Sequence, residues 1–298
     1  MASYRRAKAA PYSDEDLWNR LMLIEFTKMH GLGNDFVVID AIRQEITLSP
    51  EQIRFIADRH FGVGCDQLLL VEYGQHSDAD FRYRIFNADG SEVAQCGNGA
   101  RCFARFIRDK KLSYKDNILV DTHAGQLLLT FDDDDGLITV NMGVPRHKPA
   151  LIPLQTEQEE KFYTVKVGDV EKAFGAVSLG NPHAVLQVTD VKLAAVEEVG
   201  EALESHVFFP ERANIGFMQV IDKNNIKLRV YERGAGETLA CGSGACAAVV
   251  IGIEQHLLAN NVLVELPGGQ LKIYWEGRDH PVFMTGPAVS IFGGSIEI

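Results

Sequence analysis

One segment of this chain occurs twice, and its two copies lie 145 positions apart. The first copy spans residues 86–100 and reads FNADGSEVAQCGNGA; the second spans residues 231–245 and reads YERGAGETLACGSGA. Aligned without a gap, Cys96 falls on Cys241, and Gly-x-Gly follows each cysteine. Solenoid repeats are much shorter, about 20 to 50 residues. A repeat of this length therefore predicts a duplicated domain.

The duplication also pairs polar residues of the two halves. The offset is 147 before the repeated segments and 145 within them, and it pairs Asn34 with Asn181, Gln67 with Asn214, Asn87 with Glu232 and Asn98 with Ser243. Each half therefore supplies a similar ordered set of small polar side chains around its cysteine. A duplicated fold can place one thiol on each side of a bound molecule. Inversion of a stereocentre requires that arrangement.

Hydrophobic patterning predicts many short strands and few helices. Alternating or β-branched runs separated by Gly, Asn and Asp predict strands and hairpins, at residues 23–28, 36–40, 67–72, 81–86, 118–121, 126–131, 137–142, from 162, 173–177, 184–188, 262–275 and 282–298. The aspartate run at 132–136 predicts a hairpin turn. Helices are predicted at 50–60 after an N-cap at Ser49, and at 99–111, 190–203 and 244–259. The expected fold is α+β, with two pseudo-symmetric lobes that each wrap a strand-rich sheet around a central helix.

Composition narrows the class of protein. With 46% hydrophobic residues, the 298-residue chain can bury sizeable cores, and its length suits about two domains. The net charge of −12 argues against nucleic acid and membrane surfaces, so a small-molecule ligand is expected. Five cysteines without a disulfide framework or metal-ligand spacing predict a reducing, cytoplasmic compartment and no metal site. Residues 1–21 differ from the rest and are interpreted as an expression remnant or an over-extended start; an amphipathic arm is the weaker reading.

Cys96 and Cys241 are the candidate catalytic groups. Each precedes glycines at a predicted helix start, where free backbone N–H groups and the helix dipole favour an anion such as a carboxylate. The same field is expected to lower the pKa of a thiol from about 8.5 towards neutrality, as suits an acid/base group. Buried cysteines usually act as small hydrophobes, and that interpretation is kept for Cys65, Cys102 and Cys246. A disulfide between Cys96 and Cys241 is a third reading, as an oxidised, inactive form of the same site.

Six motifs together resemble those of diaminopimelate epimerase, of the proteobacterial type. They are GLGNDF at 31–36, AQCGNGAR at 94–101, GNPH at 180–183, RAN at 212–214, ERGAGE at 232–237 and ACGSG at 240–244, and the resemblance runs from about residue 22 to the C-terminus. It implies an enzyme that needs no cofactor and interconverts LL- and meso-diaminopimelate with two bases, for lysine and peptidoglycan precursors. It also implies an N-terminal lobe of 22–142 plus about 287–298, a C-terminal lobe of 143–286, and a homodimer.

The resemblance assigns roles to individual residues. Cys96 and Cys241 would be the thiolate and thiol of the acid/base pair. Gly97, Asn98, Gly242 and Ser243 would bind the carboxylate at the reacting end of the substrate. The other substrate groups would be held by Asn34, Gln67, Asn87, Asn181, Asn214, Glu232 and Arg233. Amides supply donor and acceptor together, Arg233 offers a fork to a distal carboxylate, and Glu232 can bind an ammonium. His183 and Glu232 would modulate the pKa of a nearby cysteine; the alternative for His183 is a histidine satisfied within a turn.

Other readings remain open at this stage. A proline racemase or hydroxyproline epimerase shares the logic of two cysteines, but a compact cyclic substrate would not need Arg233 and so many amides. An isomerase of the PhzF type keeps the two lobes without paired thiols. In a different class, a redox sensor would use a regulatory disulfide and would not need a duplicated set of polar residues. Glu92 and Glu237, each four residues before a cysteine, are ambiguous. Asp35, Asp89 and Arg101 are interpreted as turn and capping residues.

Overall fold

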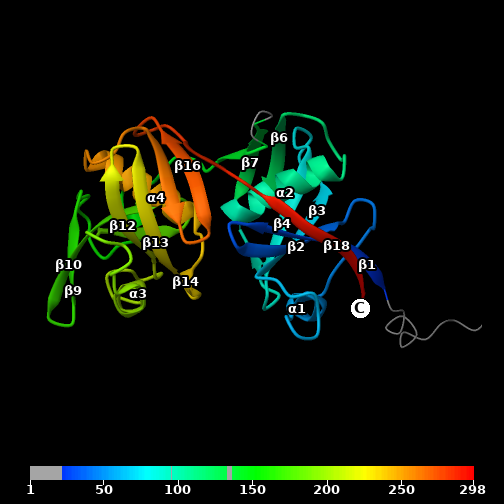
Figure 1. Ribbon diagram of the computed structural model, residues 1–298, viewed down its shortest axis with the longest axis horizontal. Coiled ribbons are helices and arrows are strands. Elements are labelled where there is room, and N and C mark those ends of the chain that lie inside the picture. Colours follow the sequence, from blue (N-terminus) through cyan, green and yellow to red (C-terminus); the bar gives the residue numbers. More distant parts are fainter. Residues whose placement is uncertain (1–21, 95, 133–135) are drawn as a thin grey trace, which may run out of the picture.

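A computed structural model describes residues 22–94, 96–132 and 136–298. The chain forms two lobes lying side by side, each a strand-rich sheet packed on a helix (Figure 1). This confirms the predicted α+β class and the two-lobed architecture. The N-terminal extension at 1–21 and the tip of the predicted hairpin turn at 133–135 lie outside the described residues.

The elements follow the same order in both halves. The first half contains β1 (Leu23–Gly31), β2 (Asn34–Asp40), α1 (Pro50–Ala57), β3 (Gln67–Tyr73), β4 (Phe81–Asn87), β5 (Glu92–Val93), α2 (Gly97–Asp109), β6 (Asn117–Thr122), β7 (Gly125–Phe131) and β8 (Ile138–Asn141). The second contains β9 (Tyr163–Val167), β10 (Val170–Ser178), β11 (Pro182–Gln187), α3 (Val196–Glu204), β12 (Asn214–Asp222), β13 (Asn225–Glu232), β14 (Gly236–Thr238), α4 (Gly242–Glu254), β15 (Asn261–Leu266), β16 (Gly269–Trp275), β17 (Val282–Gly286) and β18 (Val289–Glu297).

Strand register reproduces the duplication found in the sequence. The parallel pair β2–β3 places Phe36 opposite Gln67, and the parallel pair β11–β12 places His183 opposite Asn214. Both members of the second pair are shifted by 147 positions from the first. Helices α2 and α4 each have 13 residues and begin 145 positions apart. The two halves therefore share one topology, and equivalent residues occupy equivalent places.

Each lobe is built around the helix that follows its cysteine. In α4 the residues from Ala245 to Ile251 are all buried, so this helix is apolar on every side, as expected for one enclosed by a sheet. In α2, Phe103 and Phe106 lie in the core, and Phe103 packs edge-on against Tyr83 of β4 with ring centroids 5.2 Å apart. Because each sheet encloses its helix, the helix N-terminus has a fixed position.

The lobes are joined at the centre and by two crossing segments. Strand β8 pairs antiparallel with β17, and Thr139 and Thr285 share a hydrogen bond of 2.7 Å between their hydroxyls. After β17 the chain crosses to the first lobe, where β18 pairs with β1 (Figure 1). After β8 the chain crosses the other way, and Arg146 forms a bridge with Ser178 of β10. Each half therefore ends against the sheet of the other.

The helix boundaries differ from the predicted ones for local reasons. Helices α2 and α4 begin two residues earlier than predicted, because the cysteines themselves are the N-caps. Helix α1 has its predicted N-cap at Ser49, which forms a capping box with Gln52. The helix stops at Ala57, since Asp58 turns to accept from the backbone N–H groups of His60 and Phe61. Helix α4 ends at Glu254, shortly before His256 adopts a φ of 62°. Helix α3 begins only at residue 196, after a turn.

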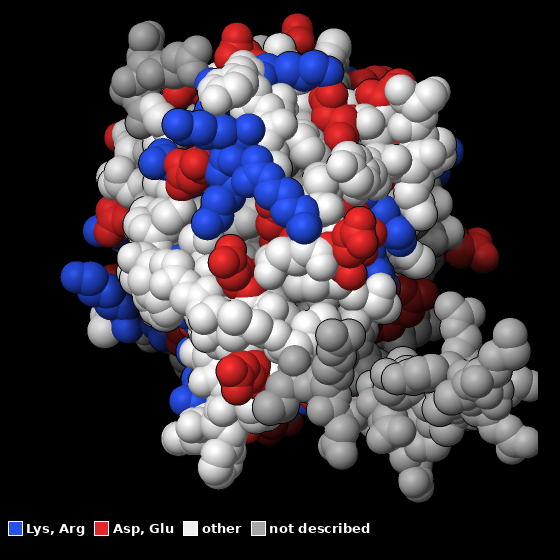
Figure 2. All heavy atoms as spheres, turned by 90° about the vertical axis from the view of Figure 1, so that its right-hand side faces the viewer, with Lys and Arg blue, Asp and Glu red and all other residues white. Residues whose placement is uncertain are grey.

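The outer end of the first lobe, away from the second lobe, carries a mixed charge pattern. Figure 2 shows lysine and arginine side chains gathered on the upper part of this face, with acidic side chains beside them.

Within the parts of the chain that the structure describes, no helix is both long enough and apolar enough to cross a membrane.

Candidate active site

Cys96 and Cys241 occupy the N-cap positions of α2 and α4. Both have extended backbone conformations, with φ of −141° and −114°, and the first helical residue follows each at once. Gly97 and Gly242 at these first positions lie close to the thioether of Met284, where an added Cβ would come within 3.0 Å of it. A larger residue at either helix start would therefore force the end of the Met284 side chain to shift.

The two helix starts meet at the boundary between the lobes. Asn98 of α2 is buried and donates from Nδ2 to the carbonyl of Ala240, the residue before Cys241, at 2.9 Å. Its Oδ1 accepts from Arg101 at 2.9 Å and lies near Gly242. The duplicated segments are therefore brought together, and each cysteine lies at the end of a helix that abuts the other helix.

Burial dominates the ionisation of the two thiols. It raises the pKa of Cys96, while the backbone amides of Asn98 and Gly99 partly offset that shift. Burial also raises the pKa of Cys241 well above its ordinary value, against the favourable amide of Gly244. The expected net lowering of the thiol pKa by the helix start was therefore wrong. The amides act in the expected direction, but desolvation is larger.

Glu232, at the end of β13, lies close to both cysteines. Its carboxylate raises the pKa of Cys96 and of Cys241. Burial in turn raises the pKa of Glu232, although Thr238 donates to its Oε1 at 2.5 Å. The first half has Asn87 at this position, so here the second lobe supplies a carboxylate and the first lobe an amide.

The polar residues predicted for the first lobe form two groups. Asn34 lies beside the cysteine, with its Oδ1 3.7 Å from Cys96 Sγ and 3.4 Å from Asn98 Nδ2. Gln67 and Asn87 lie opposite each other on β3 and β4 and share a hydrogen bond of 3.0 Å. The amide of Asn34 therefore lies closest to the cysteine, and the other two form a pair on the sheet.

The second lobe has a similar arrangement, in which Ser243 takes the place of Asn98. Asn181 donates to Ser243 Oγ at 3.4 Å, and Ser243 Oγ lies 3.7 Å from Cys241 Sγ. His183 contacts Asn181 Oδ1 at 3.0 Å, and burial, together with the charge of Arg233, lowers the pKa of His183 to about 3. The imidazole is therefore neutral, and it is connected to Cys241 through Asn181 and Ser243.

Asn214, at the start of β12, and Arg233, just after β13, are linked by a hydrogen bond. The backbone N–H of Arg233 donates to Asn214 Oδ1 at 3.0 Å, while Asn214 Nδ2 donates to the Pro182 carbonyl at 3.1 Å. The Arg233 guanidinium is exposed and donates to the Glu211 carbonyl at 3.0 Å. The other N–H donors of its guanidinium remain able to bind a carboxylate, such as one on a ligand.

The ambiguous glutamates have a structural role. Arg84 donates to both oxygens of Glu92 at 2.8 Å, and Arg229 donates to both oxygens of Glu237 at 2.5 and 2.6 Å. Each bidentate pair ties the strand before a cysteine to the preceding strand. Asp89 caps the turn at Ser91, as predicted.

Two charged residues near the site were misread in the sequence. Arg101 is fully buried rather than capping, and it donates to the Pro287 carbonyl as well as to Asn98. Asp35 lies in an ion-pair network with Arg59 and Lys28. Burial opposes ionisation of Asp35, but hydrogen bonds from these cations hold its pKa well below its usual range. The adjacent Asp66 was not singled out by any sequence motif. Its carboxylate accepts a hydrogen bond from the Asn34 side chain.

The chain matches one protein-family model and is similar in fold to several solved structures. The sequence model of the family described as diaminopimelate epimerase matches residues 26–148 and 175–291. Among solved structures, a hydroxyproline epimerase from Agrobacterium vitis is similar with a TM-score of 0.70 and 14% identity over 94% of both chains. A PhzF-family phenazine biosynthesis protein from Bacillus anthracis has a TM-score of 0.67 and 17% identity, over 93% of this chain and 100% of that one. A probable proline racemase from Agrobacterium radiobacter has a TM-score of 0.66 and 14% identity over 92% of both chains.

Proposed function

Because the chain belongs to the diaminopimelate epimerase family, we propose that this isomerase interconverts LL- and meso-diaminopimelate without a cofactor. The supporting observation is the meeting of two cysteine-capped helix starts at the lobe boundary, with Glu232 close to both thiols. One thiolate would remove the α-proton from one face of the carbon, and the opposite thiol would deliver a proton to the other face.

The helix starts suit the acidifying step of such a reaction. Free N–H groups at residues 97–99 and 242–244 would bind the substrate carboxylate as negative charge develops on it. Donors of this kind contribute about 2.7–4 kcal/mol each in an oxyanion hole. That contribution is needed because an α-hydrogen beside an ammonium is only weakly acidic.

Glu232 would couple substrate binding to activation of the thiols. Its carboxylate opposes ionisation of Cys96 and Cys241. A substrate ammonium bound to Glu232 would neutralise that charge, so a thiolate would form more readily once substrate is present. Reactive thiolate would then be rare when the site is empty.

The charged residues favour a substrate with two amino-acid ends. Glu232 and Arg233 replace Asn87 and Ala88 of the first half, so the duplication has diverged towards charge on one side. A second amino-acid group lying off the pseudo-twofold axis would account for that asymmetry. A proline or hydroxyproline substrate is the second candidate, because the fold is shared with such enzymes.

An exchange experiment distinguishes these substrates. Incubated in D₂O under reducing conditions, the enzyme is expected to incorporate deuterium at the α-carbon of diaminopimelate and not at that of proline or hydroxyproline. Mass spectrometry of the recovered amino acids measures the exchange. Deuterium in proline alone would refute the proposed substrate and support the second candidate.

Oxidation gives a second prediction. All five cysteines, which lie in the described part of the chain, are free, and Cys96 and Cys241 sit at abutting helix starts. Aerobic storage of the substrate-free enzyme is therefore expected to abolish activity by linking these two thiols, and dithiothreitol should restore it. Peptide mass spectrometry of inactive material should find this linkage; oxidation of Cys102 or Cys246 instead would contradict the convergence of the two thiols.

A further inference from the structure

The two asparagines beside the cysteines are held in opposite orientations. Asn34 donates from Nδ2 to Asp66 Oδ2 at 3.1 Å, which turns its carbonyl oxygen towards the start of α2. There that oxygen accepts from Asn98 at 3.4 Å and lies 3.7 Å from Cys96 Sγ. A carboxylate can only accept hydrogen bonds, so an ionised Asp66 requires this orientation of the Asn34 amide.

In the second half the equivalent amide is reversed. The neutral imidazole of His183 contacts Asn181 Oδ1 at 3.0 Å, so Asn181 presents its NH₂ group to Ser243, beside Cys241. The position equivalent to Asp66 is Ala213, which has no carboxylate. The Asn34 amide therefore presents a hydrogen-bond acceptor towards Cys96, whereas the Asn181 amide presents a donor towards the surroundings of Cys241.

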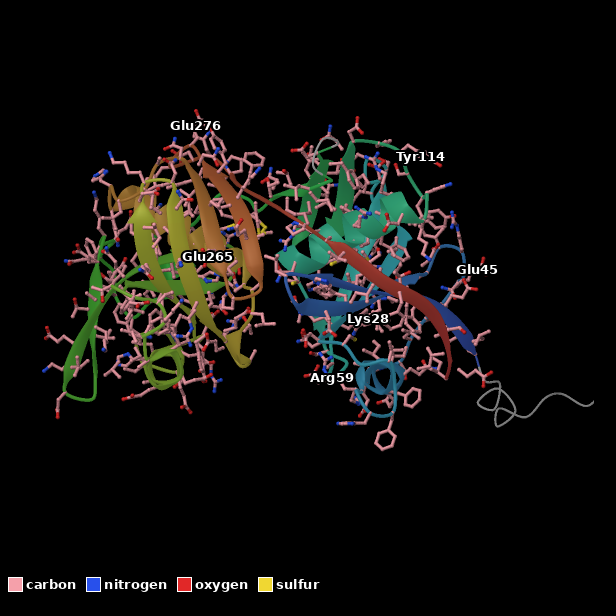
Figure 3. All side chains as sticks on the ribbon, in the orientation of Figure 1. Lys28, Glu45, Arg59, Tyr114, Glu265 and Glu276 are labelled. Atoms are coloured by element: carbon pink, nitrogen blue, oxygen red, sulfur yellow. The ribbon has the colours of Figure 1, made fainter. Side chains whose placement is uncertain are left out.

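Asp66 is itself firmly held. Arg59 donates to Asp66 Oδ1 at 2.7 Å, and the backbone N–H of Asp35 donates to Oδ2 at 3.1 Å. Arg59 also bonds to Asp35, which in turn pairs with Lys28 at 2.6 Å. Arg59 and Lys28 lie near each other in the lower part of the first lobe (Figure 3). Asp66 thus has one cationic partner, Arg59, and that partner is shared with Asp35.

We propose that Asp66 is a positioning residue that fixes the Asn34 amide, so that Cys96 meets a hydrogen-bond acceptor and favours its protonated thiol form in the empty site. The catalytic meaning of this assignment rests on the proposed function. Cys96 would then be held ready to deliver a proton. The ionisation of Cys96 can nevertheless be measured without any substrate.

Other groups around Cys96 also influence its ionisation. Glu232 of β13 opposes it, and Arg101 of α2 favours it. Tyr83 of β4 shares hydrogen bonds with the backbone of Cys96, and Cys102 lies six residues further along the chain, inside α2. None of these groups bonds to the Asp66 carboxylate in the described structure. The charge of Asp66 does raise the pKa of Glu232. A change at Asp66 should therefore reach Cys96 through Asn34 or through charge, directly or by way of Glu232.

Alkylation of Cys96 across a pH series tests the proposal. In Asp66→Asn the Asn34 amide can turn and donate to the thiolate, so the midpoint pH of iodoacetamide labelling at Cys96 is expected to fall by about one unit, or 1.4 kcal/mol. Peptide mass spectrometry follows each cysteine, and the midpoint at Cys241 should stay within error of the unmodified protein. Asp279→Asn, which removes an exposed carboxylate in the second lobe, is the matched control and should shift neither midpoint.

A double-mutant cycle separates the amide from the charge. If Asp66 acts through Asn34, adding Asp66→Asn to Asn34→Ala should leave the Cys96 midpoint unchanged. A shift of equal size in both backgrounds, or no shift in Asp66→Asn alone, would overturn the proposal. Asp66→Ala carries the same expectation and takes the place of Asp66→Asn if thermal unfolding shows that variant to be misfolded. Labelling needs no turnover, so failure here is distinct from failure of the α-exchange experiment.

Discussion

Replacing either Cys96 or Cys241 with alanine should reduce epimerisation by about 10³-fold and leave the protein folded. Each thiol lies at its own helix start, so one thiol can take a proton from one face but cannot deliver a proton to the other. The loss should appear in kcat in both reaction directions, because each direction uses both groups. Thermal unfolding should change by no more than about 1 kcal/mol, since alanine fits the small space left by a thiol.

Cys65→Ala is the matched control for this experiment. Cys65 is also buried, and burial raises the pKa of its thiol to about 11, but it lies in a separate core cluster of the first lobe. Its variant should retain turnover. Cys→Ser at either site position should retain partial exchange of the α-hydrogen, because a hydroxyl remains. Near-normal turnover in Cys96→Ala or Cys241→Ala would show that the two-base assignment is wrong.

Arg233→Ala should raise KM and lower kcat together, with a combined loss of about 10²-fold in kcat/KM. Binding energy at the far end of a substrate helps to place the reacting carbon between the two thiols. The exposed guanidinium of Arg233 sits beside Asn214 and the end of β13, where a distal carboxylate would meet it. Arg233→Lys keeps the charge but loses the planar fork, so it should already be damaging.

Arg54→Ala provides the comparison for Arg233. Arg54 is an exposed arginine of α1 that pairs with Glu51, and its loss should leave both kinetic constants within error of the unmodified enzyme. Steady-state kinetics with diaminopimelate measure both variants. Normal binding and turnover in Arg233→Ala would mean that this residue is structural, and the proposed substrate would lose its main cationic contact.

Sequence reasoning succeeded where a local pattern repeats. The paired segments predicted two equivalent helices after the cysteines, and α2 and α4 have the same length and the same position in each lobe. Their starts were misplaced by two residues because cysteine is an unusual N-cap, and no capping hydrogen bond from its side chain marks it. The pairing of Asn34 with Asn181 was visible because both residues stand in similar motifs.

The sequence could not predict which way an amide points. Asn34 and Asn181 have the same residue type, but the partners that orient them differ between the halves. Asp66 lies 32 positions from Asn34, whereas His183 lies only two positions from Asn181. Arg101 was misread for a similar reason, since its partner at Pro287 lies 186 positions away. Desolvation of the thiols likewise depends on packing from both lobes, which a motif does not record.

The exchange of terminal segments between the lobes has a consequence for any attempt to divide the molecule. Strand β18 belongs by sequence to the second half but completes the sheet edge at β1, and the segment after β8 bridges into β10 in return. Each lobe thus includes a segment from the other half of the chain. The arrangement resembles a domain-swapped dimer whose two copies have been joined into one chain. A fragment cut between the halves would expose an open sheet edge in each piece, so the two fragments should fold only when mixed.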